Sequence, residues 1–268
     1  MKILFLGDII GPVGCEAIKK NLLKIKKKED IDFIVVNGEN SADNGVGITE
    51  KITNEFLNSG VDVITTGNHV WDQKETADYI NRQNRLLRPY NLISPSPGEG
   101  FGVYKSENGF QVGVLNLMGN VFMRKCEDVF KIAEIFLEKN ILKKNFDFLI
   151  VDFHGEITSE KNAIGHMFDG KASLVVGTHT HIPTSDTRIL EKGTGYQTDA
   201  GMCGDYNSVI GMDKKNSLNK FLKKEAKKNY PSKGEVTLSG VIIECDKKTG
   251  LAKTIEPLIY GGALKNTN

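Results

Sequence analysis

Short apolar runs and amphipathic stretches alternate along residues 1–82. Residues 2–7, 32–36 and 61–65 are apolar runs of the length expected for buried strands. Residues 13–28, 49–58 and 73–82 favour helices; the first has lysines opposite its apolar face, and Thr49 could be the N-cap of the second. Strands that alternate with helices predict a parallel sheet with right-handed crossovers.

The pattern changes after a loop rich in proline and glycine at residues 85–100. Two β-prone runs flank Asn108-Gly109 and predict a hairpin, and the tail predicts another. The expected strands are 101–105, 110–117, 147–152, 172–177, 235–245 and 252–260, and the expected helices are 127–144, 163–168 and 214–228. We therefore predict an α/β fold, a four-layer α/β/β/α sandwich of two mixed sheets packed face to face with helices outside, in a single domain over residues 1–268.

Composition narrows the class of protein without naming a function. Hydrophobic residues make up 39% of 268 residues, enough for a sizeable core, and the formal net charge of +1 gives no general attraction to nucleic acid or membrane. The four cysteines are far apart in sequence and form no C-x-x-C pair, which indicates a reduced, cytoplasmic protein. No apolar segment has the length of a membrane span.

Polar residues with carboxylate, amide or imidazole side chains follow the predicted strands. These residues are Asp8, Glu39, Asn40, Asn68, His69, His154, His179 and His181. Open α/β sheets place their sites at the carboxyl ends of the strands, so we expect one cluster there. Oxygen and imidazole ligands without thiolate suit a hydrolytic metal centre.

The spacing His179-Thr180-His181 adds to this picture. In an extended segment, residues i and i+2 point the same way, so both rings could face one site. The cluster then has enough ligands for two ions about 3.5–4 Å apart, as in two-metal hydrolases. Two divalent ions outweigh the charges of Asp8, Glu39 and a bridging hydroxide, and the net positive charge favours an anionic phosphoester.

Five motifs in order resemble those of the calcineurin-like metallophosphoesterases. They are Gly7-Asp8, Gly38-Glu39-Asn40, Gly67-Asn68-His69, His154-Gly155 and Gly177-Thr178-His179-Thr180-His181. Ile10 stands where the superfamily usually has histidine, and Glu39 where it usually has aspartate. Both departures match the bacterial YmdB-like branch of 2′,3′-cyclic nucleotide phosphodiesterases, which the chain resembles from residue 1 to about residue 260.

The resemblance implies a dinuclear centre with two divalent or trivalent ions. Iron is the metal that the resemblance favours, and manganese or zinc would also suit nitrogen and oxygen ligands. One ion would be held by Asp8, Glu39, Asn40 and His181, and the other by Glu39, Asn68, His154 and His179. We hypothesise that a metal-activated hydroxide attacks phosphorus in line while His69, free of metal, protonates the departing ribose oxygen.

Other functions remain open at this stage. A broad phosphodiesterase or phosphomonoesterase would use the same centre, and a nucleotide-sensing regulatory protein would turn over slowly. Gly7, Gly11 and Gly14 weakly resemble a dinucleotide-binding turn, although Pro12 lies inside it and the histidines would have no role. A homo-oligomer is expected only because most soluble oligomers are symmetric assemblies of one chain.

Several further residues have two interpretations. Asp72 could be a helix N-cap or could orient His69, and Trp71 beside it suits packing. Cys203 near Asp199 could suggest a thiol nucleophile, although packing is the simpler interpretation. His166 has no ligand neighbours in sequence. The lysines between residues 214 and 228 suit a solvated helix face, and the few aromatic residues there argue against RNA binding.

Overall fold

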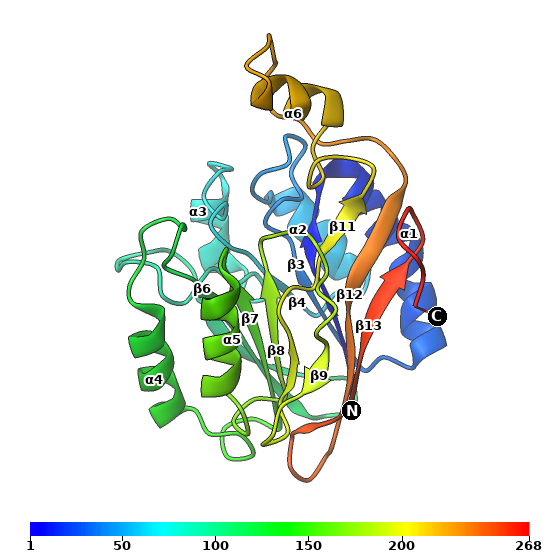
Figure 1. Cartoon of the computed structure of the whole chain (residues 1–268). Coiled ribbons are helices and arrows are strands. Elements are labelled where there is room, and N and C mark those ends of the chain that lie inside the picture. The colour runs from blue at the N-terminus through cyan, green and yellow to red at the C-terminus, as the bar shows by residue number, and fades with distance from the viewer. Residues whose placement is uncertain (268) are drawn as a thin grey trace.

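The computed structural model describes residues 1–267 and contains two β-sheets packed face to face (Figure 1). The seven-stranded sheet has the order β2-β11-β12-β1-β3-β4, with β13 paired to β12. Strands β1, β3 and β4 are parallel, and β12 runs antiparallel to β1. The bounds are β1 Lys2–Leu6, β2 Asp8–Ile9, β3 Phe33–Asn37, β4 Val63–Thr65, β11 Met202–Asp205, β12 Val236–Cys245 and β13 Ala252–Tyr260.

The six-stranded sheet has the order β5-β6-β7-β8-β10-β9. Its centre is parallel from β6 to β10, and its two edge strands, β5 and β9, are antiparallel to their neighbours. The bounds are β5 Phe101–Lys105, β6 Gln111–Met118, β7 Phe148–His154, β8 Leu174–Thr178, β9 Arg188–Ile189 and β10 Gly195–Gln197. Both predicted hairpins, β5–β6 and β12–β13, are confirmed.

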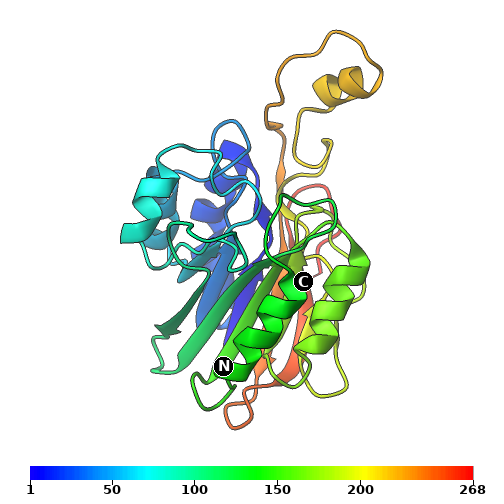
Figure 2. The same ribbon diagram turned by 90° about the vertical axis from the view of Figure 1, so that its left-hand side faces the viewer.

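Helices cover the outer faces of both sheets (Figure 2). The helices are α1 Gly11–Glu29, α2 Glu50–Asn58, α3 Thr76–Tyr79 followed by a 3₁₀ turn at Ile80–Arg82, α4 Val129–Lys139, α5 Thr158–Met167 and α6 Lys214–Phe221. One apolar cluster joins α1 and α2 to the seven-stranded sheet, a second lies between the sheets, and a third joins α4 and α5 to the six-stranded sheet. The predicted four-layer sandwich is therefore confirmed.

The apolar runs of the sequence are explained by burial on both faces of each sheet. In β1, Leu4 faces the helices, whereas Ile3 and Phe5 face the other sheet. Both sets are fully buried, so apolar residues occupy successive positions rather than alternate ones. Thr49 caps α2 as predicted, because its hydroxyl accepts a hydrogen bond from the Ile52 backbone amide at 3.2 Å.

Three predicted helices are longer than the helices that form. The segment 73–82 forms only α3 and the 3₁₀ turn, and the segment 214–228 is helical only to Phe221. Helix α4 stops at Lys139 because Asn140 is extended and Lys143 has a φ of 66°, which no α-helix accommodates. The short strands β2, β9, β10 and β11 were not predicted, since two to four residues carry too little pattern.

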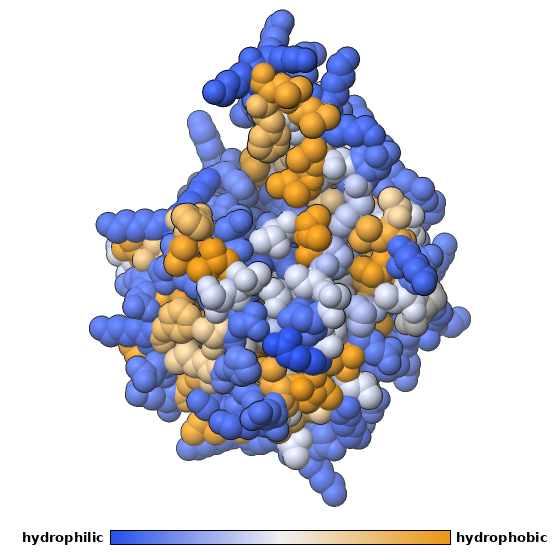
Figure 3. Space-filling view, viewed as in Figure 1, coloured by the Kyte–Doolittle hydropathy of each residue, from blue (hydrophilic) through white to orange (hydrophobic). Residues whose placement is uncertain are grey.

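Residues 206–235, hereafter the arm, leave the sandwich between β11 and β12 and carry α6 (Figure 1). Apolar side chains gather on it at the top of Figure 3, and Leu218, Phe221 and Leu222 there are between 52% and 78% exposed. Among the described helices, none has the length and apolar character that crossing a membrane requires.

Candidate metal centre

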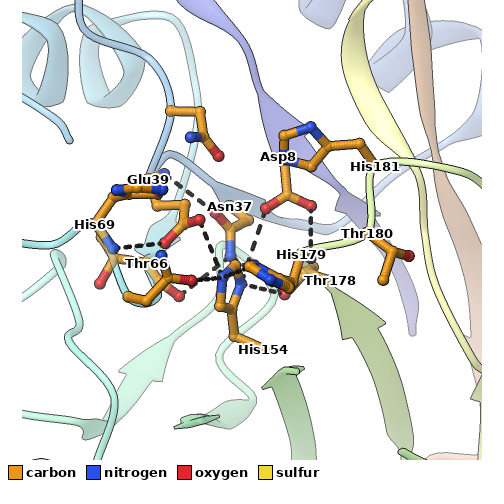
Figure 4. A network of polar contacts seen from close by, with 12 residues as sticks. Asp8, Asn37, Glu39, Thr66, His69, His154, Thr178, His179, Thr180 and His181 are labelled. Atoms are coloured by element: carbon orange, nitrogen blue, oxygen red, sulfur yellow. Dashed lines mark hydrogen bonds and ion pairs between the residues drawn. The ribbon is translucent and has the colours of Figure 1, made fainter. Parts of the chain in front are cut away.

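The eight predicted site residues lie at the carboxyl ends of parallel strands from both sheets. Figure 4 labels Asp8, Glu39, His69, His154, His179 and His181 among them. The seven-stranded sheet brings every predicted oxygen ligand: Asp8 in β2, Glu39 and Asn40 after β3, and Asn68 after β4. The six-stranded sheet brings every predicted nitrogen ligand: His154 at the end of β7, and His179 and His181 after β8. The two sheets therefore contribute different chemical classes of ligand to one site.

Three side chains converge on His154 Nε2. Glu39 Oε1 and Asn68 Oδ1 each lie 3.0 Å from this nitrogen, and His179 Nδ1 lies 3.1 Å from it. Ligand atoms of Glu39, His154 and His179 lie within 4.8 Å of one another, which is close enough for a shared ion. One N–H could satisfy only one of three acceptors, whereas a cation would satisfy them all.

The second group of predicted ligands contains two buried oxygen atoms that accept no hydrogen bond. Within residues 1–267, Asp8 Oδ1, Asn40 Oδ1 and Thr237 Oγ1 are the buried side-chain oxygens that make no hydrogen bond. Asn40 Nδ2 donates to the Gly45 carbonyl at 2.9 Å, which fixes the amide and leaves its oxygen free. Buried oxygens rarely stay unsatisfied, so these two atoms fit an oxygen-binding cation.

The two histidines of the His-x-His motif do not lie in an extended segment, so the predicted extended geometry is wrong. His179 has a φ of 96° and His181 a φ of 67°, both in the left-handed region. Both rings nevertheless line one cavity with Glu39. Asp8 helps to hold this backbone, because its Oδ2 accepts a hydrogen bond from the His179 amide at 3.1 Å. The turn, rather than the alternation of a strand, directs the rings of His179 and His181 toward this cavity.

The outer nitrogens of these two rings bond to groups that can only accept. His179 Nε2 lies 3.1 Å from Glu156 Oε2, and His181 Nδ1 lies 2.9 Å from the Ile210 carbonyl oxygen in the arm. Each outer nitrogen therefore carries hydrogen, and each inner nitrogen offers its lone pair to the site. Neither Glu156 nor Ile210 was singled out from the sequence, since both contacts depend on the fold.

The charged groups of the cluster shift one another's pKa values. Burial alone would raise the pKa of Glu39, but His154 and His69 outweigh it and hold that pKa at about 2. Burial would lower the pKa of His154, but Glu39 and Asp8 raise it to about 9. Burial and the nearby His154 lower the pKa of His179 to about 3. Burial raises the pKa of Asp8, against the opposing effect of His181 and His154.

His69 lies beside this cluster and is paired with a carboxylate. Its Nδ1 lies 2.7 Å from Asp72 Oδ2, and Arg124 Nη2 lies 2.9 and 3.0 Å from the two oxygens of Asp72. The N-cap interpretation of Asp72 is wrong, because α3 begins only at Thr76 and its cap position is Glu75. The geometry agrees with the alternative, in which Asp72 orients the ring.

A cavity of about 500 Å³ opens over the cluster. His69, Glu156 and the predicted ligands Glu39, Asn40, His179 and His181 line it, together with Asn44, Val46, Thr180, Ile210, Met212, Lys228 and Asn229. The arm supplies Ile210, Met212, Lys228 and Asn229. These four residues belong to no sequence motif, so the sequence could not identify them as part of the site. The cavity has the size of a small-molecule site.

Two other candidates do not belong to this chemistry. Cys203 is fully buried, and burial raises the pKa of its thiol to about 12, so a thiol nucleophile is excluded at neutral pH. Its neighbour Asp199 instead forms a buried ion pair with Lys161 Nζ at 2.6 Å. His166 is exposed on α5, in agreement with an ordinary surface role.

Comparisons with known proteins agree with the resemblance in sequence. The curated "2′,3′-cyclic-nucleotide 2′-phosphodiesterase" of Bacillus subtilis strain 168 is 43% identical over 265 residues, 97% of either chain. A crystal structure of "a novel phosphatase" from Mycoplasma pneumoniae has a TM-score of 0.89 and 36% identity, and the match covers 97% of this chain and 93% of that one. A hypothetical protein from Thermus thermophilus also has a TM-score of 0.89, with 33% identity over 98% of this chain and 100% of its own.

The similarity therefore covers sequence and fold over nearly the whole chain. A family model described as "YmdB-like protein" matches residues 4–258, which contain all five motifs and every predicted site residue. The chain belongs to the YmdB-like protein family.

Proposed function

We propose that this protein hydrolyses 2′,3′-cyclic nucleotides at a dinuclear metal centre held by Asp8, Glu39, Asn40, Asn68, His154, His179 and His181. The observation that carries the proposal is the joint arrangement of ligand atoms. Three side chains converge on His154 Nε2, and the buried oxygens Asp8 Oδ1 and Asn40 Oδ1 accept no hydrogen bond. Glu39 belongs to the first group, and by the resemblance to the family it would be shared by both ions.

The bound ions would polarise the phosphate and make water a nucleophile at neutral pH. The chain's own residues would do the remaining work. His69 lines the cavity, and Asp72 would orient its ring through Nδ1, leaving Nε2 to give a proton to the departing ribose oxygen. Arg124 would keep Asp72 in place from the other side.

The substrate class is inferred from the relatives and the cavity. The Bacillus subtilis relative is named for action at the 2′ position of 2′,3′-cyclic nucleotides. We extend that activity to this chain, with the 3′-phosphate as the expected product. The volume of about 500 Å³ suits one nucleotide, and Lys228 at its wall suits an anionic ligand.

Further parts of the proposal concern metal and location. Iron is the proposed native metal, with manganese and zinc as functional substitutes, because the ligands are imidazole nitrogens and oxygens without thiolate. All four cysteines are free, which supports a reducing cytoplasm. We also propose a homo-oligomer without affinity for RNA, the latter because the lysines of α6 have few aromatic neighbours.

The decisive experiment is hydrolysis of 2′,3′-cyclic AMP by the purified protein with added Mn²⁺ or Fe²⁺, against a chelated control. We expect metal-dependent turnover to the 3′-phosphate, with two ions per chain by elemental analysis. His69→Ala should lower kcat by about 10²–10⁴-fold while both ions remain bound. Full turnover of His69→Ala would refute the general acid.

The same assay separates the alternatives. Cleavage of an aryl phosphodiester or phosphomonoester without cleavage of 2′,3′-cyclic AMP would keep the metal centre and replace the substrate. Binding of the cyclic nucleotide without multiple turnover would indicate the sensor instead, because a sensor need not release product.

A further inference from the structure

His154 differs from the other two predicted histidine ligands in its outer partner. His179 and His181 bond to a carboxylate and a carbonyl, which only accept hydrogen bonds. His154 Nδ1 instead lies 2.9 Å from the hydroxyl oxygen of Thr178. A hydroxyl can donate or accept, so Thr178 alone does not decide which nitrogen of His154 carries hydrogen.

The next residue along the network decides it. Thr178 Oγ1 lies 2.7 Å from Asp152 Oδ1, and both Asp152 and Thr178 are fully buried. The other oxygen of Asp152 accepts hydrogen bonds from Asn37 Nδ2 at 2.9 Å and from Thr65 Oγ1 at 2.5 Å. Three donors thus surround one carboxylate, an arrangement that suits an ionised group accepting from each.

We infer that Asp152, acting through the hydroxyl of Thr178, is a positioning residue that fixes His154 with hydrogen on Nδ1 and a lone pair on Nε2. The hydroxyl hydrogen of Thr178 points to Asp152, so its oxygen accepts from His154 Nδ1–H. The lone pair of Nε2 then points at the meeting place of Glu39, Asn68 and His179. This inference rests on the proposed metal centre, in which His154 is a ligand.

The same carboxylate also reaches the ligands of the other sheet. Asn37 donates its amide to Asp152, which turns the amide oxygen toward the backbone N–H of Glu39 at 3.1 Å. Asp152 lies on β7 of the six-stranded sheet, and Asn37 ends β3 of the seven-stranded sheet. One buried carboxylate therefore sets the direction of hydrogen bonds behind a nitrogen ligand and an oxygen ligand.

The test compares two matched threonines by titration of the metal-free full-length protein with Zn²⁺ alone. Thr178→Val removes the hydroxyl between Asp152 and His154, and we expect the affinity for one of two Zn²⁺ ions to fall by about 10–100-fold. Thr65→Val removes a hydroxyl from the same carboxylate but not from the path to His154, so its Zn²⁺ affinities should stay as in the wild type. Thr178→Ser should restore the wild-type value.

Asp152→Asn tests the direction of the bonds without changing volume. The asparagine oxygen would face the two donors Asn37 and Thr65, so its NH₂ group would face Thr178. Thr178 would then donate to His154 Nδ1 and place hydrogen on Nε2, where the ion must bind. We expect a loss at least as large as for Thr178→Val, partly reversed in the Asp152→Asn/Thr178→Val double variant, because that variant no longer forces the wrong tautomer.

The outcomes separate this inference from the proposed function. A wild-type protein that binds two Zn²⁺ ions, with equal affinities in Thr178→Val, would overturn the positioning role and keep the metal centre. Equal losses in Thr65→Val and Thr178→Val would also overturn it, because the effect would then come from general disturbance of Asp152. A wild-type protein that binds no Zn²⁺ would overturn the metal centre and the inference together.

Discussion

Asp199→Asn should strongly destabilise the protein although the change is isosteric. Asp199 and its partner Lys161 are at most 1% exposed, and their charged atoms lie 2.6 Å apart. Asp199 Oδ2 also accepts hydrogen bonds from the amide and hydroxyl of Thr180, at 3.2 and 2.7 Å, and Oδ1 accepts from the Gly201 amide at 2.8 Å. Thr180 separates the two predicted ligand histidines, so this carboxylate holds the turn that aims them.

The size of the effect follows from counting donors. Four donors face the two oxygens of Asp199. An asparagine has only one oxygen, so in either orientation its NH₂ group meets at least one N–H or O–H donor. Lys161 also keeps a buried charge without its counter-charge. Breaking a buried ion pair from one side costs about 3–5 kcal/mol, a large part of the stability of an ordinary domain.

The assay is urea unfolding of the metal-free protein, monitored by circular dichroism. All variants are fitted with one value of m, the slope of the free energy of unfolding against urea concentration. Lys161→Met is the matched control, since Asp199 would keep three donors and the loss should be smaller. The double variant Asp199→Asn/Lys161→Met should be more stable than Asp199→Asn alone, because no unpaired charge remains. A loss below about 1 kcal/mol in Asp199→Asn, or strictly additive losses, would refute the reasoning.

Three other predictions follow from the site. In the metal-free protein, His154 has a pKa raised to about 9, so its pairing with Glu39 stabilises the fold fully below pH 6.5 and is lost as the pH rises through about 9. The lowered pKa of Glu39, about 2, adds stability that is present above pH 4.5 and lost as the pH falls through about 2. Thermal unfolding of the metal-free protein at a series of pH values checks both the alkaline and the acid loss of stability. A melting temperature that does not change with pH would contradict both. Asp72→Asn should lower kcat while both ions remain bound, because the ring of His69 loses the carboxylate that orients it at 2.7 Å; an unchanged kcat would remove that role. Iodoacetamide should leave the native enzyme active, because Cys203 is buried with a pKa of about 12; inactivation with Cys203 alkylated, detected by mass spectrometry, would contradict this.

Much of the fold could be predicted because its strands are buried on both faces. Runs such as Phe33–Asn37 are apolar at nearly every position, and parallel pairing then brings the residues that follow them to a common edge. The order of Asp8, Glu39, Asn68 and His154 along the chain was enough to predict that they meet. Their roles as ligands remain predictions that metal binding will test.

The remaining features depend on contacts that local sequence patterns do not specify. Arg124 reaches Asp72 across 52 residues, and Thr65 reaches Asp152 across 87. The left-handed turn at His179 is imposed by surrounding hydrogen bonds, since histidine itself prefers negative φ. The carbonyl of Ile210, near the start of the arm, meets His181 across 29 residues of sequence. Long-range partners of this kind complete the site around motifs that the sequence displays.

The division of ligand chemistry between the sheets has a thermodynamic consequence. In the proposed centre, the seven-stranded sheet alone would have only oxygens and the six-stranded sheet alone only imidazoles. An ion held by both therefore acts as a removable cross-link, favouring the docked pair over any state in which they separate. At a free ion concentration 100 times Kd, binding adds about 2.7 kcal/mol to the free energy of unfolding. Metal supply would then regulate the cohesion of the sandwich as well as its catalysis.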